Sequence, residues 1–171
     1  MKRIYIILIA LNVFFVQSCY RKSQKKTNDF SQVNDLIDQW HKNVALFDFD
    51  AYFNAMTDDA VFIGTDASEV WSKQEFMDFS KPFFDKKQTW DFIPLERHVY
   101  FSKTEKLAWF DETLNTWMGV CRGSGVVVKE ENHWLIKQYV LSMTIPNDVS
   151  REVVSLKQKQ DSVFIQKFIK P

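Results

Sequence analysis

The hydrophobic pattern of the chain changes its period once, close to Trp90, and this change limits the folds available to it. Before Trp90, apolar residues recur at steps of three and four, the spacing of one helix face, and residues 28–47 form the longest such segment. A short apolar run, AVFIG, predicts one strand between the helices. After Trp90, four segments alternate apolar and polar residues and are rich in β-branched and aromatic side chains. The sequence therefore predicts an α+β fold with N-terminal helices packed on one face of a curved, mostly antiparallel sheet.

Three further helices are expected, and the first is a short one over the segment DFDAYFNAMTDD. Ser72 followed by Glu75 has the spacing of a capping box, so a helix begins there, and Pro82 is expected to kink or end it. Residues 149–171 predict a helical tail that docks on the sheet or on a second subunit.

The N-terminal residues have the pattern of an export signal. Lys2 and Arg3 precede an apolar run that only Asn12 interrupts, and the stretch from Val16 to Cys19 resembles the lipobox of bacterial lipoproteins. In such proteins a peptidase cuts before the cysteine, and the thiol then carries diacylglycerol. The resemblance implies lipidation of Cys19.

This resemblance divides the chain into four parts: a lipoprotein signal peptide over residues 1–18, a lipidated Cys19 with a basic tether over residues 19–27, a domain over residues 28–148, and the tail. An uncleaved signal anchor is the alternative, although about fourteen apolar residues are few for a membrane span. Both alternatives predict a bacterial cell-envelope protein that is attached to a membrane and faces the periplasm.

Charge and residue spacing exclude several functions. From Thr27 onward the chain has 16 basic and 22 acidic residues, and an acidic domain argues against nucleic acid as a partner. His41 and His98 show none of the paired spacings of metal sites, so neither a metal nor a cofactor is expected.

The segment Gly123-Ser124-Gly125 has the composition of a phosphate-binding loop. Such a loop leads into a helix N-terminus, whose N–H groups converge on the anion. Here three valines follow directly, which is typical of a strand. The glycines instead predict a place where the strand bends or where another side chain crosses its backbone.

Several segments resemble the SnoaL-like (NTF2-like) families. These segments are IGTDASEVWSKQEF, FDETLN, RGSGVVVK, HWLIKQYVLS and IPND, and the order of helices and strands agrees from about residue 28 to residue 148. The resemblance implies a cone in which helices pack on the concave face of the sheet and leave a pocket. It implies no single function, because this fold carries isomerases, dehydratases, cyclases and non-enzymatic binders.

Strand alternation predicts which residues face this pocket. On the last strand, Trp134 and Ile136 mark the inner face, which brings Gln138 into the pocket. The resemblance places Asp66 and Trp71 at the opening of the cone, although Asp66 also fits a turn in which it bonds to its own backbone.

The strand KLAWFDETLN leaves two alternatives, because either Trp109 and Asp111 or Phe110 and Glu112 face inward. The larger ring favours Trp109 with Asp111. An inward carboxylate needs a partner, and Arg122 at the start of the neighbouring strand is the expected one. The two form either a structural ion pair or a site in which the arginine holds a ligand and the aspartate moves a proton.

Three functions follow as hypotheses. The first is a lipid-anchored envelope protein whose cavity binds a small, mainly apolar molecule with a polar group near Arg122; Trp40 is a pocket residue or part of the core. The second is an acid/base isomerase, dehydratase or hydrolase in the same cavity, with Asp111 as its catalytic base. The third is a dimeric scaffold, because the open face of such a sheet pairs with a copy of itself, and exposed Trp117 and Tyr139 would be its sign.

Overall fold

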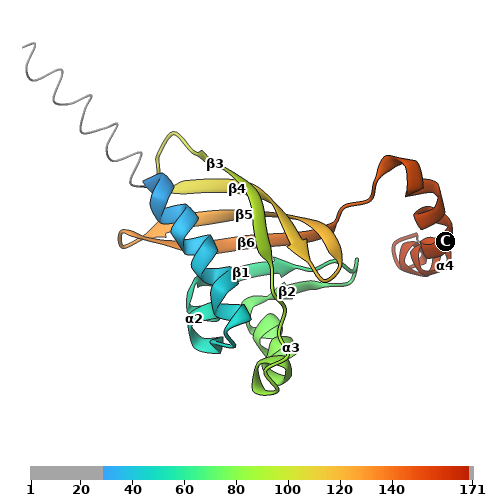
Figure 1. The fold of residues 1–171 in the computed structure, drawn as a ribbon, viewed down its shortest axis with the longest axis horizontal. Coiled ribbons are helices and arrows are strands. Elements are labelled where there is room, and N and C mark those ends of the chain that lie inside the picture. The colour runs from blue at the N-terminus through green and yellow to red at the C-terminus, as the bar shows by residue number, and fades with distance from the viewer. Residues whose placement is uncertain (1–28, 170–171) are drawn as a thin grey trace, which may run out of the picture.

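The structure, a computed structural model, describes residues 29–169 (Figure 1). The predicted lipobox, Cys19 and the whole tether lie outside the described residues. A helix, here called the N-terminal helix, occupies residues 29–45. The other elements are α2 (Phe49–Asn54), β1 (Met56–Ile63), β2 (Val70–Ser72), α3 (Lys73–Asp85), β3 (Ile93–Phe101), β4 (Leu107–Thr116), β5 (Gly119–Glu130), β6 (His133–Met143), η1 (Asn147–Val149) and α4 (Ser150–Gln166).

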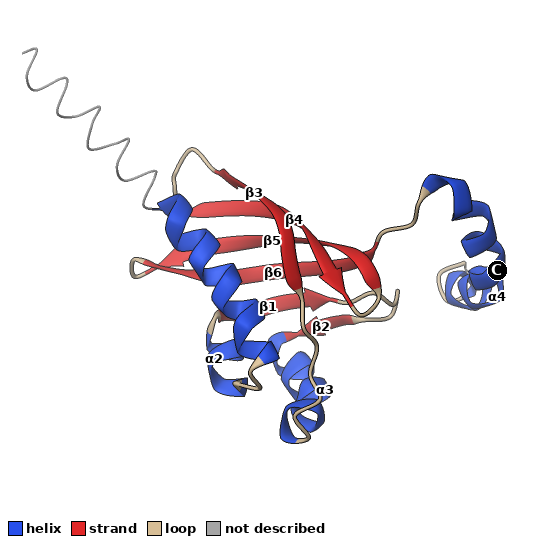
Figure 2. Ribbon diagram, in the orientation of Figure 1, coloured by secondary structure: helices blue, strands red, loops and turns tan. Residues whose placement is uncertain are grey.

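The six strands form one sheet in the order β2-β1-β6-β5-β4-β3. β1 pairs in parallel with β6, and the other neighbouring strands pair antiparallel. The N-terminal helix crosses one face of the sheet, and α2 and α3 lie at the end of the sheet formed by β1 and β2 (Figure 2). The predicted α+β fold with a curved, mostly antiparallel sheet is confirmed.

The N-terminal helix is held by the apolar face that the sequence predicts. Val33, Ile37, Trp40 and Val44, at steps of three and four, have exposures of 1% or less. The Trp40 ring meets the ring of Tyr139 on β6 with centroids 4.7 Å apart. Full burial of side chains of this size contributes about 1.5–3 kcal/mol each, so packing rather than helix propensity fixes this helix on the sheet.

The capping box at the start of α3 is confirmed. The Ser72 hydroxyl accepts a hydrogen bond from the Glu75 backbone N–H, and the Glu75 carboxylate accepts one from the Ser72 N–H at 2.8 Å. Pro82 lies inside α3 rather than at its end, and the helix continues to Asp85.

The face of β4 that points into the core is the alternative that the sequence analysis did not favour. Phe110 and Glu112 are buried, with exposures of 2% and 1%, whereas Trp109 is 45% exposed on the outer face. Trp109 stacks on Tyr100 of β3, with ring centroids 5.9 Å apart. The Trp109 ring therefore packs on the outer face of the sheet, against Tyr100. The expectation that Trp109 and Asp111 point inward is wrong.

An irregularity also reverses the expected alternation in β6. Val126 and Val127 are adjacent in β5, but their partners in β6 are Gln138 and Ile136, so β6 carries one extra residue between them. Ile136 and Tyr139 are both fully buried as a result. Gln138 pairs with Val126 on the outer face, and the predictions that Gln138 faces inward and Tyr139 outward are wrong.

The C-terminal helix α4 lies beyond the end of the sheet (Figure 1) and has no buried residue. Val154 and Leu156 in α4, and Phe168 just after its end, are between 62% and 80% exposed. None of the described helices is long and apolar enough to cross a membrane.

Candidate functional site

Tyr139 reaches across one strand to a carboxylate on the next. Its hydroxyl donates to Oε1 of Glu112 at 2.9 Å, although Tyr139 lies on β6 and Glu112 on β4, with β5 between them. On β5, Gly123 pairs with Glu112 and Gly125 pairs with Tyr139. A side chain also lies across the backbone at Gly125, where an added Cβ atom would be 2.7 Å from atoms of the Phe110 ring. The prediction that these glycines mark side chains crossing the strand is confirmed.

Glu112 is the centre of a buried polar network. Its side chain has no exposure, and Oε1 lies 2.8 Å from Nε2 of His41 on the N-terminal helix. Nε of Arg97 on β3 donates to Oε2 at 2.9 Å. With the bond from Tyr139, three groups from three elements contact one carboxylate, which compensates for the loss of its hydration.

The network keeps Glu112 ionised. Burial alone raises the pKa of the carboxyl, but its interactions with His41 and Arg97 and the hydrogen bond from Tyr139 outweigh burial and hold the pKa below its usual value. Burial and the neighbouring Glu112 carboxylate raise the pKa of Tyr139 well above its ordinary value, so its hydroxyl remains a donor.

Arg97 extends the network from the core to the surface. Its side chain is 6% exposed, and Nη1 donates to Oδ1 of Asp38 at 2.7 Å. Asp38 and His41 are one turn apart on the N-terminal helix, so both ends of the network attach this helix to the sheet. The arrangement positions the helix over strands β3, β4 and β6.

A cavity of about 160 Å³ lies at the other end of the core, where α3, β1, β2 and the turn between β4 and β5 meet. Its wall contains a stack of rings: Phe76 lies 3.9 Å from Phe62 and 5.8 Å from Trp71, and Trp71 lies 4.5 Å from Phe79, between centroids. The lining residues are mostly aromatic or apolar; they are Phe62, Gly64, Thr65, Glu69, Trp71, Phe76, Phe79, Trp90, Phe92, Trp117, Met118 and Leu141.

The arrangement of helices, sheet and cavity agrees with known proteins. The sequence model of a family described as the SnoaL-like domain matches residues 33–146, which is more than half of the chain. The chain belongs to the SnoaL-like domain family. A search of curated proteins finds no match.

Solved structures share the fold of this SnoaL-like domain at low sequence identity. An NTF2-like protein of unknown function from Pseudomonas putida is 13% identical, with 70% of this chain and 89% of that chain covered and a TM-score of 0.59. A proposed dehydratase of the NTF2-like family from Streptomyces avermitilis is 14% identical, with coverages of 71% and 99% and a TM-score of 0.61. A proposed scytalone dehydratase from Novosphingobium aromaticivorans is 8% identical, with coverages of 72% and 89% and a TM-score of 0.60. These likenesses show the NTF2-like fold.

Among the predicted pocket residues, the SnoaL-like domain places Trp71 in the cavity wall. Trp40 is 1% exposed and stacks on Tyr52 with centroids 4.8 Å apart, so it belongs to the core. Asp66 accepts hydrogen bonds from the backbone and hydroxyl of Ser68, at 2.8 and 2.5 Å, and these bonds lower the pKa of its carboxyl. Asp66 is therefore the turn residue that the sequence left as an alternative.

The other predicted site residues lie away from the cavity. Asp111 is on the outer face of the sheet, and its Oδ1 lies 3.2 Å from Nδ1 of His98 rather than beside Arg122. Arg122 is exposed and pairs with Thr113 across the strands. Trp109 and Gln138 also lie on this outer face. The inward-facing group of Asp111, Arg122 and Gln138 that the sequence predicts is therefore not formed. On β4 the opposite set of residues faces the core, and the extra residue in β6 turns Gln138 outward.

The sequence analysis missed the roles of His41 and Arg97. His41 follows Ile37 by four residues and precedes Val44 by three, so it shares the apolar face of the N-terminal helix and its burial could have been read from that spacing. Arg97 has no comparable signal. Within the described residues, no group of three or more histidine, cysteine or acidic side chains is placed to hold a metal ion.

Proposed function

We propose that this SnoaL-like domain binds a small, mainly apolar molecule in the aromatic cavity and acts as a lipid-anchored protein of the cell envelope. The observation that carries the binding proposal is the ring-lined wall formed by Phe62, Trp71, Phe76 and Phe79. An apolar cavity of about 150 Å³ in another protein stays dry and binds benzene. The cavity here is of similar volume, about 160 Å³, which fits a molecule with one ring.

Toluene tests the binding proposal. Titration should shift the indole N–H resonance of Trp71 in a saturable way, and Met118→Trp should abolish the response by filling the cavity. Leu46→Trp adds the same ring at a position that is 62% exposed and outside the cavity, so it should leave the response intact. Equal responses in both variants, or none in the unaltered protein, would contradict the proposal.

The lipid anchor rests on the stretch from Val16 to Cys19. Mass spectrometry of protein extracted from its own membrane should show a mature chain that begins at a diacylated Cys19. Cys19→Ala should leave the protein soluble in the envelope. Recovery of that variant in the membrane with an intact N-terminus would show a retained signal anchor instead.

An acid/base reaction is not part of this proposal. Among the described residues that line the cavity, Glu69 is the only carboxylate. Its Oε2 accepts a hydrogen bond from the Asp66 N–H at 3.1 Å and so serves the turn between β1 and β2.

A homodimer is the second proposal, and the stacked pair of Tyr100 and Trp109 carries it. Both rings are 45% exposed on the outer face of the sheet, and two adjoining exposed rings form an apolar contact surface that a second copy of the chain could cover. Sedimentation should show a dimer that Trp109→Arg dissociates. Phe83→Arg, at a ring on α3 that is 40% exposed, is the matched control. A monomer at micromolar concentration would refute the dimer.

A further inference from the structure

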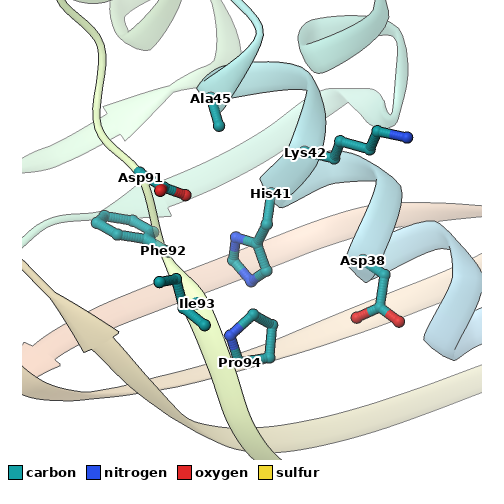
Figure 3. Close-up of a pocket in the computed structure, with 8 residues that line it drawn as sticks. All are labelled: Asp38, His41, Lys42, Ala45, Asp91, Phe92, Ile93 and Pro94. Atoms are coloured by element: carbon teal, nitrogen blue, oxygen red, sulfur yellow. The ribbon is translucent and has the colours of Figure 1, made fainter.

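A groove of about 480 Å³ lies between the N-terminal helix and the chain that leads into β3. It shares only Phe92 with the residues that line the aromatic cavity, so it is a separate site. Figure 3 shows the His41 imidazole in the middle of the lining side chains. These are Asp38, His41, Lys42, Ala45, Asp91, Phe92, Ile93 and Pro94.

The bond to Glu112 requires a proton on Nε2 of His41. Nε2 lies 2.8 Å from Oε1 of Glu112, and an ionised carboxylate can only accept hydrogen bonds. Glu112 is ionised because Arg97 and Tyr139 also contact it. Nδ1 is then the nitrogen left for another partner, with a lone pair in the neutral ring and an N–H in the charged ring.

Nδ1 of His41 is buried and has no hydrogen-bond partner in the described part of the chain. The whole residue is 3% exposed. In Figure 3 one ring nitrogen faces the side of the groove formed by Asp91 and Phe92. Because a buried polar atom without a partner costs about 1–3 kcal/mol, a group that supplies the missing hydrogen bond would bind favourably here.

The surroundings of His41 define the chemistry of that group. Among the residues that line the groove, Asp38 is paired with Arg97, and Asp91 and Lys42 have opposite charges, so the lining has no excess of positive charge for an anion. The chain from Thr27 onward is also acidic. A hydroxyl donates to the neutral imidazole and can also accept a bond if Nδ1 gains a proton. Ala45, Ile93 and Pro94 offer apolar contact to the rest of the molecule.

We infer that this groove is a second binding site, for a neutral molecule that has a hydroxyl on a small apolar body, and that the hydroxyl bonds Nδ1 of His41. The site is independent of the aromatic cavity. It uses His41 for recognition, while Glu112 acts as a positioning residue that fixes the tautomer.

Phenol and toluene test this inference as a matched pair, because they differ in the hydroxyl. In NMR of protein labelled with ¹⁵N, phenol should shift the Nδ1 resonance of His41 in a saturable way, and toluene at equal concentration should leave it unchanged. The response should persist in Met118→Trp, in which the aromatic cavity is filled, so the two sites can fail separately. Equal shifts from both compounds, or no shift from phenol, would overturn the inference.

His41→Gln separates recognition from structure. The glutamine amide can still donate to Glu112, but it has no acceptor at the position of Nδ1. Phenol should bind this variant about tenfold more weakly, as read from the Lys42 and Ala45 amide signals. Unchanged phenol affinity in a folded His41→Gln protein would show that Nδ1 is not the contact, and the measurement on the unaltered chain decides the question if this variant does not fold.

Discussion

A Cβ atom at Gly123 would lie 2.2 Å from the hydroxyl oxygen of Tyr139 and 2.9 Å from Oε1 of Glu112. Tyr139 can therefore cross β5 only because position 123 has no side chain. The backbone of a central strand here provides the passage through which a hydroxyl on one neighbouring strand meets a carboxylate on the other.

Gly123→Ala should destabilise the fold. The added methyl group would displace the Tyr139 hydroxyl, and overpacking of this kind costs about 1–3 kcal/mol, to which the lost hydrogen bond adds. Urea denaturation measures the change in the free energy of unfolding. Ser124→Ala, at the next position and on the outer face, is the control and should have a much smaller effect. Similar losses in both variants would mean that the close contact is not the cause.

Tyr139→Phe should cost about 1–3 kcal/mol, because it removes one of the two donors to Oε1 of the buried Glu112 carboxylate and leaves His41 as the other. Tyr100→Phe removes a hydroxyl from an exposed ring and serves as the control. Because Tyr139→Phe also removes the atom that a Cβ at Gly123 would strike, the two substitutions should be non-additive in a double-mutant cycle. Additive effects would refute the proposed crossing.

Stability should decrease in acid because of Glu112. Its folded-state pKa lies below the unfolded-state value of about 4.3, so its contribution is fully present above that value and is lost as the pH falls through the folded-state pKa. Urea midpoints between about pH 3 and pH 7 measure this dependence. Glu112→Gln should lower the free energy of unfolding by about 3–5 kcal/mol at neutral pH, because Arg97 loses its buried partner. It should also reduce the further loss of stability as the pH falls from 7 to 3. Asp111→Asn, on the outer face, is the control and should show the same loss of stability in acid as the unaltered protein.

Ser72→Ala should destabilise α3 by about 1 kcal/mol, because it removes the side-chain acceptor of the capping box. Thermal unfolding followed by circular dichroism measures the change. Ser162→Ala, in the exposed α4, removes a hydroxyl that bonds only the backbone of its own helix and should alter the main transition little.

The fold was predictable because its signals are local and repeated. The helix face of Val33, Ile37 and Trp40 and the alternation after Trp90 each extend over several turns or strands, and the capping box at Ser72 marks its boundary by itself. An irregularity in one strand does not alter these patterns in the other elements, so the prediction of the elements is unaffected by it.

The residues that face inward were harder to predict, because one extra residue reverses a whole strand. The irregularity between Ile136 and Gln138 moves Tyr139 into the core, and no single residue type marks it in advance. On β4 the choice depended on ring size, and Trp109 had an unforeseen contact in Tyr100. The polar network joins elements that are far apart in sequence, so its pairing appears only in three dimensions.

The bare backbone at Gly123 also has an evolutionary consequence. A descendant that replaces Tyr139 removes the atom nearest to a Cβ at position 123, so a side chain becomes easier to accommodate there, whereas a change at position 123 alone meets an occupied space. Across related sequences, glycine at this position should therefore be inherited together with the tyrosine, and its loss should follow the loss of the tyrosine.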